Sequence, residues 1–211
     1  LENEFIDDLK KNKYFYSGLK TTIPEGIKIF KFEKFDELLK SNVDLIVLGI
    51  SSKGIEWVAS QLSRLYQNKA MPKLLMLTKG LSVHNNKYEL LVDKLERLLS
   101  EKGIKNINLS AIGGPCLATG LANRVHSGVV IANKNLHTAK SISKMLSTDY
   151  YHTSVSSDIN GVEVCAAIKN IFSMVIGASR GLNKTKPDEN LYLNTSAALV
   201  KQSLYEMEIF T

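Results

Sequence analysis

Lys169 is the side chain of this sequence that is best suited to chemistry. It lies in the mostly apolar run Gly161–Gly177, whose charged residues are Glu163 and Lys169. The length and composition of the run predict a buried helix. Burial favours the neutral form of a lysine amine, and a neutral amine can accept a proton near physiological pH. Two other interpretations stay open here: a lysine that reaches out to the helix edge, and a lysine paired with Glu163.

A second lysine follows a predicted strand. Thr78-Lys79-Gly80 lies at the end of the apolar run Lys73–Thr78, and ligands bind at the carboxyl ends of strands in an open sheet. A lysine there can hold a phosphate or a polarised carbonyl as a point charge. A solvated loop lysine is the simpler alternative, and the residue by itself does not exclude it.

A glycine-rich turn, Gly113-Gly114-Pro115-Cys116, follows the predicted strand Ile107–Ile112. Two glycines let the backbone approach a ligand closely, and the free amides at the start of the next helix suit an anion. Pro115 is expected in the first turn of that helix. An ordinary strand-to-helix turn is the alternative. No histidine is tied to Cys116 by the sequence, which favours an inert small side chain over a nucleophile.

Over the first two-thirds of the chain, short apolar runs alternate with amphipathic helical patterns. Strands are predicted at Ile27–Phe30, Asp44–Ile50, Lys73–Thr78, Ile107–Ile112, Gly128–Ala132 and Tyr150–Val155. Helices are predicted at Phe35–Leu39, Lys53–Tyr66, Tyr88–Ser100 and His137–Leu146. Trp57 lies on the apolar face of its helix and is expected in the core. The alternation predicts an α/β fold with a mostly parallel sheet and flanking helices.

The pattern changes from Asp158 onward. A long helix, a polar loop at Asn183–Asn190 and another helix from about Leu191 follow. We therefore expect a domain boundary near residues 153–158, with one domain at 1–155 and the beginning of a helical domain at 156–211. The chain starts without methionine and ends without a helix stop signal, so we expect an internal piece of a longer protein.

Composition narrows the class of protein. Hydrophobic residues make up 44% of the 211 residues and charged residues 23%, which is ordinary globular usage. The longest apolar stretches, Leu45–Ile50 and Val164–Ile168, are too short to span a bilayer. The cysteines and histidines show no disulfide or metal spacing, so no metal site is expected. The net charge of +6 is spread over scattered lysines, which favours anionic metabolites over nucleic acid as partners.

Taken together, the motifs resemble those of the NAD(P)-dependent glycerol-3-phosphate dehydrogenases. The matching segments are Thr78-Lys79-Gly80, Gly114-Pro115-x-x-Ala118, Asp158-x-x-Gly161-Val162-Glu163, Ala167-Ile168-Lys169-Asn170, Gly177-x-x-x-Gly181, Asn194-x-x-Ala197-Ala198-Leu199 and Glu206-Met207. The resemblance covers nearly the whole chain and is weaker before Asp44. It implies a Rossmann-like nucleotide-binding domain that lacks its first βα unit, followed by the beginning of a helical substrate-binding domain.

The resemblance also implies roles for individual residues. Lys169 matches the proton acceptor at the substrate hydroxyl, and Lys79 matches a lysine that contacts both substrate and cofactor. Gly114, Cys116 and Asn170 match substrate-binding positions, and Ala118 matches a cofactor-binding position. The implied reaction interconverts dihydroxyacetone phosphate and sn-glycerol 3-phosphate with NAD or NADP. We further expect a small phosphorylated three-carbon substrate, a cytoplasmic location and a homodimer. We expect no nucleic-acid partner and no membrane span.

Several positions depart from the family pattern. Cys116 stands where Ser or Thr is usual, Gly120 stands where an acidic residue is usual, and Gly49–Ser52 replaces Val-Pro-Ser. The chain contains neither GxGxxG after a first strand nor the family's Arg-Asn motif, so we expect this piece to be inactive by itself. These departures motivate an alternative, a non-catalytic binding or scaffold protein on a degenerate dehydrogenase fold.

Overall fold

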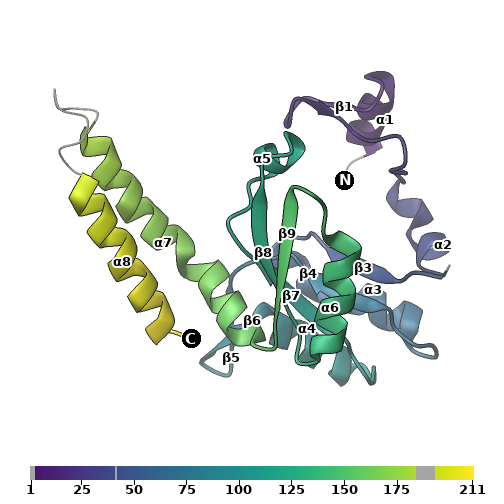
Figure 1. Cartoon of the computed structure of the whole chain (residues 1–211). Helices are drawn as coiled ribbons and strands as arrows, with labels where there is room; N and C mark the ends of the chain where they lie inside the picture. Colours follow the sequence, from purple (N-terminus) through teal and green to yellow (C-terminus); the bar gives the residue numbers. More distant parts are fainter. Residues whose placement is uncertain (1–2, 41, 184–192) are drawn as a thin grey trace.

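The centre of the protein is a five-stranded sheet. The computed structural model describes residues 3–40, 42–183 and 193–211, so residues 184–190 of the expected polar loop lie outside the described residues. The strand order is β3-β4-β7-β8-β9 (Figure 1). The strands span Leu45–Leu48 (β3), Lys73–Met76 (β4), Leu109–Gly113 (β7), Ser127–Ala132 (β8) and Tyr151–Ser156 (β9). Only the β7–β8 pairing is antiparallel in this sheet, which confirms the predicted mostly parallel sheet.

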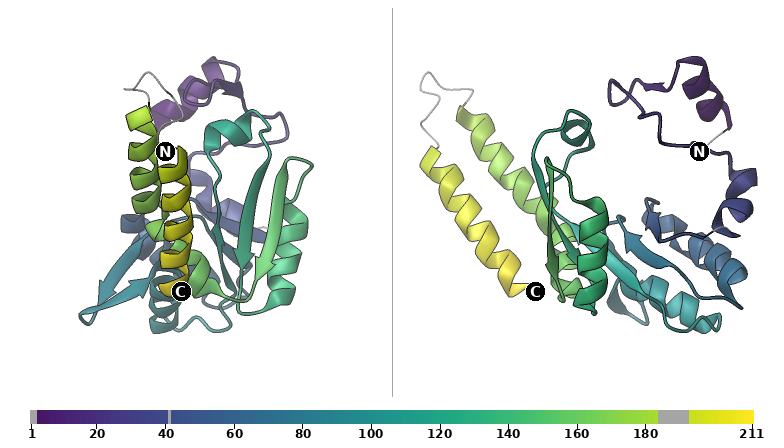
Figure 2. Two further views of the ribbon diagram at one scale, coloured as in Figure 1. Left: turned by 60° about the vertical axis from the view of Figure 1, so that its left-hand side comes forward. Right: turned by 45° about the vertical axis from the view of Figure 1, so that its right-hand side comes forward.

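Helices cover both faces of the sheet because the sheet strands are apolar on both sides. Leu74 and Met76 of β4 pack with α3 (Ile55–Tyr66) and α4 (Leu91–Glu101). Leu75, between them in the sequence, points to the other face and packs with α6 (Leu136–Leu146). Successive residues of a strand point to opposite faces, so one short run serves two cores. Figure 2 shows this layered arrangement from two sides.

A buried amide network holds the end of β8 against the start of β7. The Asn133 side chain is nearly inaccessible, and its amide nitrogen donates to Asn108 Oδ1, the Leu109 carbonyl and Ser110 Oγ. Its oxygen accepts the backbone N–H of Asn135 at 2.7 Å. A buried polar group without these partners would cost free energy, so the network fixes where β7 begins relative to the end of β8.

The segment before β3 is less regular than expected. It contains α1 (Asn3–Lys11), the two-residue strands β1 (Phe15–Tyr16) and β2 (Thr21–Thr22), the 3-10 turn η1 (Phe32–Lys34) and α2 (Phe35–Lys40). The predicted strand Ile27–Phe30 is wrong, since this stretch has no strand assignment and Ile27 is 55% exposed. A strand needs a neighbour for its backbone N–H and C=O groups, and no described segment pairs with this one.

Two other expectations need correction. The helix predicted to begin at Tyr88 begins at Leu91, because β5 (Leu81–His84) and β6 (Lys87–Leu90) form a hairpin first. Asn85 and Asn86 have φ values of 50° and 60°, which is the two-residue turn that hairpins favour. Trp57 is 45% exposed rather than core. Its ring lies on the aromatic rings of Phe32 and Phe35 instead of on the sheet.

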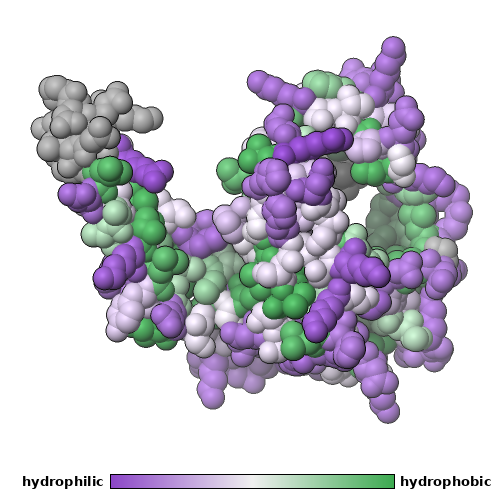
Figure 3. Space-filling view, in the orientation of Figure 1, coloured by the Kyte–Doolittle hydropathy of each residue, from purple (hydrophilic) through white to green (hydrophobic). Residues whose placement is uncertain are grey.

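A helical hairpin follows the sheet. It consists of α7 (Ile159–Asn183) and α8 (Leu193–Ile209), which pack against each other and project away from the strands (Figures 1 and 2). The first half of α7 lies against β7, and Ser179 Oγ meets Ser196 Oγ at 2.7 Å between the helices. Hydrophobic side chains are exposed along this hairpin (Figure 3), among them Ile171, Met174 and Leu204.

The apolar character of α7 bears on the expectation that nothing spans a membrane. By length and composition alone, Ile159–Leu182 qualifies as a candidate span, with a mean hydropathy of 1.5 over its most apolar window. A core helix of a soluble protein meets the same criterion. The first half of the helix carries Glu163 and Lys169, and both side chains bond to the sheet domain.

Candidate active site

One face of α7 lies on the carboxyl end of β7. The helix begins with Asp158 Oδ1 accepting the N–H of Gly161 at 2.8 Å, a typical N-terminal cap. A Cβ atom placed on Gly113 would lie 3.0 Å from Val162 Cγ1 and 3.6 Å from Ala166 Cβ. Val162, Ala166 and Lys169 are spaced i, i+4, i+7 and therefore share one helix face. Helix packing thus brings Lys169 to the strand end.

Lys169 is held by the backbone of the glycine turn. Its Nζ donates to the Gly114 carbonyl at 2.9 Å. Pairing with Glu163, one of the alternatives, does not occur, because the Glu163 carboxylate accepts the backbone N–H of Val92 at 3.2 Å. The lysine is half-buried rather than extended to the helix edge.

A cleft of about 570 Å³ opens beside this contact. Gly113–Pro115 at the end of β7 form one wall, and Cys165 and Lys169 on α7 form another. Leu204 and Met207 of α8 close the outer side. The cleft therefore combines one amine, one exposed backbone turn and apolar walls, which is the usual make-up of a small-molecule site.

Two physical effects favour the neutral amine at Lys169. Burial lowers the pKa of Lys169, and the positive charge of Lys79 lowers this pKa further, while Cys116 acts weakly in the opposite direction. Lys79 itself is exposed at the end of β4, the strand paired in parallel with β7. The charge of Lys79 thus acts on Lys169 from a different element, although Lys79 does not line the cleft itself.

The turn at Gly114 requires glycine. Its φ is +156°, and a Cβ there would lie 2.6 Å from the Gly128 carbonyl oxygen and 2.8 Å from the Val129 Cα. The Gly114 carbonyl accepts the Cys116 N–H at 3.1 Å as well as the Lys169 ammonium. Backbone conformation therefore aims this oxygen at the lysine.

The remaining predicted residues lie around the cleft rather than in it. Cys116 is half-buried beside the turn, and Ala118 is exposed as the first residue of α5 (Ala118–Ala122). The sequence predicted Pro115 in the first turn of this helix, and that prediction is wrong. The helix begins at Ala118, with Leu117 as the residue before it. Asn170 is exposed and next to Lys169.

Two close contacts were not predicted from the sequence. Glu163, seen at first as a partner for Lys169, bonds to α4 instead. His126 Nδ1 and His152 Nε2 lie 2.9 Å apart, because parallel pairing sets Gly128 beside His152. Only strand register could have revealed that pair. No group of three or more His, Cys, Asp or Glu side chains among the described residues could hold a metal ion.

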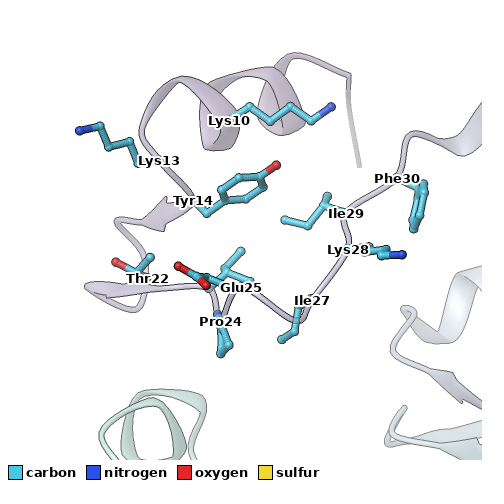
Figure 4. Close-up of a pocket in the computed structure, with 11 residues that line it drawn as sticks. Lys10, Lys13, Tyr14, Thr22, Pro24, Glu25, Ile27, Lys28, Ile29 and Phe30 are labelled. Carbon is cyan, nitrogen blue, oxygen red and sulfur yellow. The ribbon is translucent and has the colours of Figure 1, made fainter.

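A larger pocket, of about 730 Å³, lies far from these lysines in the sequence. Residues between Lys10 and Phe30 line it. Figure 4 shows Tyr14 and Ile29 facing its interior and the Lys13 ammonium directed away. None of the residues predicted to do chemistry contributes to it, so size alone does not identify the functional site.

Comparison with known families agrees with this geometry. A family model described as NAD-dependent glycerol-3-phosphate dehydrogenase N-terminus matches residues 2–139, and the corresponding C-terminus model matches residues 158–211. The chain belongs to the NAD-dependent glycerol-3-phosphate dehydrogenase family. The N-terminus model covers the sheet domain as far as α6, and the C-terminus model covers α7 and α8.

Individual members of the family are distant relatives. An NADP(+)-dependent glycerol-3-phosphate dehydrogenase of Archaeoglobus fulgidus is 26% identical over 86% of this chain and 52% of its own length. A glycerol-3-phosphate dehydrogenase [NAD(P)+] of Clostridium botulinum is 25% identical over 98% of this chain and 57% of its own length. The chain therefore spans about half the length of these curated relatives.

Solved structures of the same family share the fold. The glycerol-3-phosphate dehydrogenase of Coxiella burnetii superposes with a TM-score of 0.71 at 24% identity, over 98% of this chain and 58% of that one. The enzyme of Dunaliella salina gives a TM-score of 0.74 at 22% identity, over 99% of this chain and 33% of that one. These matches confirm the Rossmann-like sheet with flanking helices.

Proposed function

We propose that this chain forms part of an NAD(P)-dependent glycerol-3-phosphate dehydrogenase, which interconverts dihydroxyacetone phosphate and sn-glycerol 3-phosphate. The observation that carries the proposal is the contact between Lys169 Nζ and the Gly114 carbonyl, 2.9 Å apart at the edge of the cleft. It places an amine with a lowered pKa beside a turn that only glycine can form. Family membership supplies the reaction, and the site supplies a group that can move its proton.

Lys169 acts as the proton acceptor in this proposal. In the oxidation direction the neutral amine takes the proton of the substrate hydroxyl, and in reduction the ammonium returns it. An ammonium has three N–H donors. One is directed to the Gly114 carbonyl, which leaves two for a substrate oxygen. The bound nicotinamide cofactor would supply or accept the hydride.

The other groups bind and orient. Lys79, exposed at the end of β4, would hold substrate and cofactor by its charge, at the sheet edge where dinucleotides lie in this fold class. Gly114, Cys116 and Asn170 would contact substrate, and Ala118 would contact the cofactor. Gly80 (φ +133°) and Gly114 (φ +156°) place backbone without a side chain in the turns that follow β4 and β7, which suits the close approach of a flat ring. The proposed cofactor is NAD or NADP.

We further propose a cytoplasmic protein without a membrane span, acting on a small phosphorylated substrate as a homodimer. Docking of the first half of α7 on β7, with Glu163 bonded to α4 and Lys169 bonded to the turn at Gly114, supports a helix of a soluble domain. We propose residues 1–155 as the nucleotide-binding domain and 156–211 as the beginning of the helical one. The change from sheet to helical hairpin at α7 supports this division.

Substitution of Lys169 tests the function directly. In the protein as the cell makes it, Lys169→Met should lower kcat by about 10²–10⁴-fold, the usual contribution of acid–base catalysis. Lys140→Met, which changes an exposed lysine on α6, is the matched control and should retain activity. Turnover of the Lys169 variant within about threefold of the parent would contradict the role. Tight binding of NAD(P)H with no turnover in the parent would favour the scaffold alternative.

A further inference from the structure

Glu163 is a buried acid that the proposed reaction does not use. Its side chain lies on α7, six residues before Lys169, and the residue is 6% exposed. Burial raises its pKa from the ordinary value of 4.5 to about 7, although the bond from Val92 acts in the opposite direction. Burial of a carboxyl group costs free energy unless the group is hydrogen-bonded. The hydrogen-bond partner of Glu163 is therefore informative.

That partner lies at the start of α4. Glu163 Oε2 accepts the N–H of Val92 at 3.2 Å, and Val92 is the second residue of the helix. The first N–H groups of a helix have no partner within it, and the residue before this helix, Leu90, has no capping side chain of its own. Glu163 therefore caps α4 from another helix, 71 residues away in the sequence.

The start of α4 is also the base of the Lys79 turn. The chain leaves Lys79-Gly80, runs out through β5 and returns through β6, so that Leu81 pairs with Leu90. A Cβ on Gly80 would lie 3.8 Å from Leu91 Cδ1. The amide that Glu163 binds is therefore next to the turn that carries Lys79.

We propose that Glu163 is a positioning residue that fastens α7 to the base of the Lys79 turn and thereby sets the separation of Lys79 and Lys169. The inference rests on the proposed function, in which both lysines serve one substrate. The separation determines how strongly the charge of Lys79 acts on the Lys169 amine, because Coulomb energy falls with distance. It also determines whether both amines reach the same small molecule.

The fastening works through a hydrogen bond rather than through charge. Asp93 on α4 is the charged group that acts on Glu163, and no lysine or arginine among the described residues forms an ion pair with it. A protonated carboxyl retains an acceptor oxygen. Both forms of Glu163 can therefore hold Val92, and an uncharged amide can replace them.

The test measures Lys169 itself and needs no turnover. Acetylation of Lys169 is followed against pH by mass spectrometry in the intact chain, for the parent, Glu163→Gln and Glu163→Leu. Glu163→Gln keeps an acceptor and should leave the midpoint within about 0.3 of a pH unit. Glu163→Leu should raise the midpoint by about half a unit or more, because Lys169 loses part of its burial and of the field of Lys79.

Controls make every outcome decisive. Ser179→Ala removes a buried hydrogen bond from the far half of α7 and should not move the midpoint. Circular dichroism checks that each variant folds. If Glu163→Leu does not fold, Glu163→Ala, with its smaller side chain, replaces it. An unchanged midpoint in a folded apolar variant, or an equal shift in Glu163→Gln, overturns the proposal. An active Lys169→Met enzyme would refute the proposed function without affecting this labelling result.

Discussion

The two walls of the cleft are built by different means. At the end of β7 the backbone does the positioning, through parallel pairing of Ala111 with Met76 of β4 and the glycine conformation at Gly114. On α7 the side chains do it, through the face that carries Val162 and Lys169. The strand wall therefore depends on local geometry, whereas the helix wall depends on contacts between segments far apart in the sequence.

The largest effect is expected at the strand wall. Gly114→Ala would place a Cβ 2.6 Å from the Gly128 carbonyl oxygen, at a φ of +156°. Backbone strain and overpacking each cost about 1–3 kcal/mol, so we expect a loss of about 3 kcal/mol in the free energy of unfolding. Urea denaturation measures it.

Gly128→Ala is the matched control for this substitution. It lies on β8 beside the turn, and a Cβ there meets nothing within 4 Å. A change within about 0.5 kcal/mol is therefore expected. Equal stability of the two variants would mean that the backbone at Gly114 can move, and the strand wall would then be no more rigid than the helix wall.

The contribution of the helix wall to the free energy of unfolding should instead depend on pH. The pKa of Glu163 is raised to about 7 in the folded chain, so between pH 4.5 and 7 the folded state binds more protons at this group than the unfolded state. Its contribution to stability is fully present below pH 4.5 and is lost as the pH rises through 7. The rise in pKa from 4.5 to about 7 corresponds to a cost of about 3 kcal/mol for ionising the buried acid.

Comparison with Glu163→Gln isolates this contribution, because the amide does not titrate. The difference in unfolding free energy, parent minus Glu163→Gln, should fall as the pH rises from 4.5 to 7 and then level off. Carboxyl groups such as Asp36, whose pKa Arg64 lowers, respond at lower pH and cancel in the difference. A flat difference would show that Glu163 is as solvated as a surface acid.

The same contrast explains what the sequence could reveal. Lys79 and Gly114 were found because each follows an apolar run, and the end of a strand is a local signal. The apolar composition around Lys169 predicted its helix, and the family motif predicted its role. The mostly parallel pairing followed from the alternation of elements, and the sheet confirms it.

What the sequence did not reveal depends on contacts between distant segments. The Glu163–Val92 bond joins residues 71 positions apart, and no periodicity encodes it. Trp57 looked like core because a helical pattern shows which residues share a face but not which neighbour covers that face. The β5–β6 hairpin was missed for a different reason: its Asn85-Asn86 turn was a local signal, but the leucine spacing after Tyr88 outweighed it.

The smallest expected effect measures the coupling between the two walls. Lys79→Met removes the positive charge that, after burial, contributes most to lowering the pKa of Lys169. This pKa should therefore rise, while burial keeps it below the ordinary value. Acetylation of Lys169 against pH reports the shift, and Lys73→Met, at the opposite end of β4, should leave the pKa of Lys169 unchanged.

An equal response to both substitutions would mean that Lys169 senses the net charge of the sheet rather than Lys79. A response to Lys79 alone would show that the charge following β4 acts on the Lys169 amine of the helix wall, as a shared substrate would require.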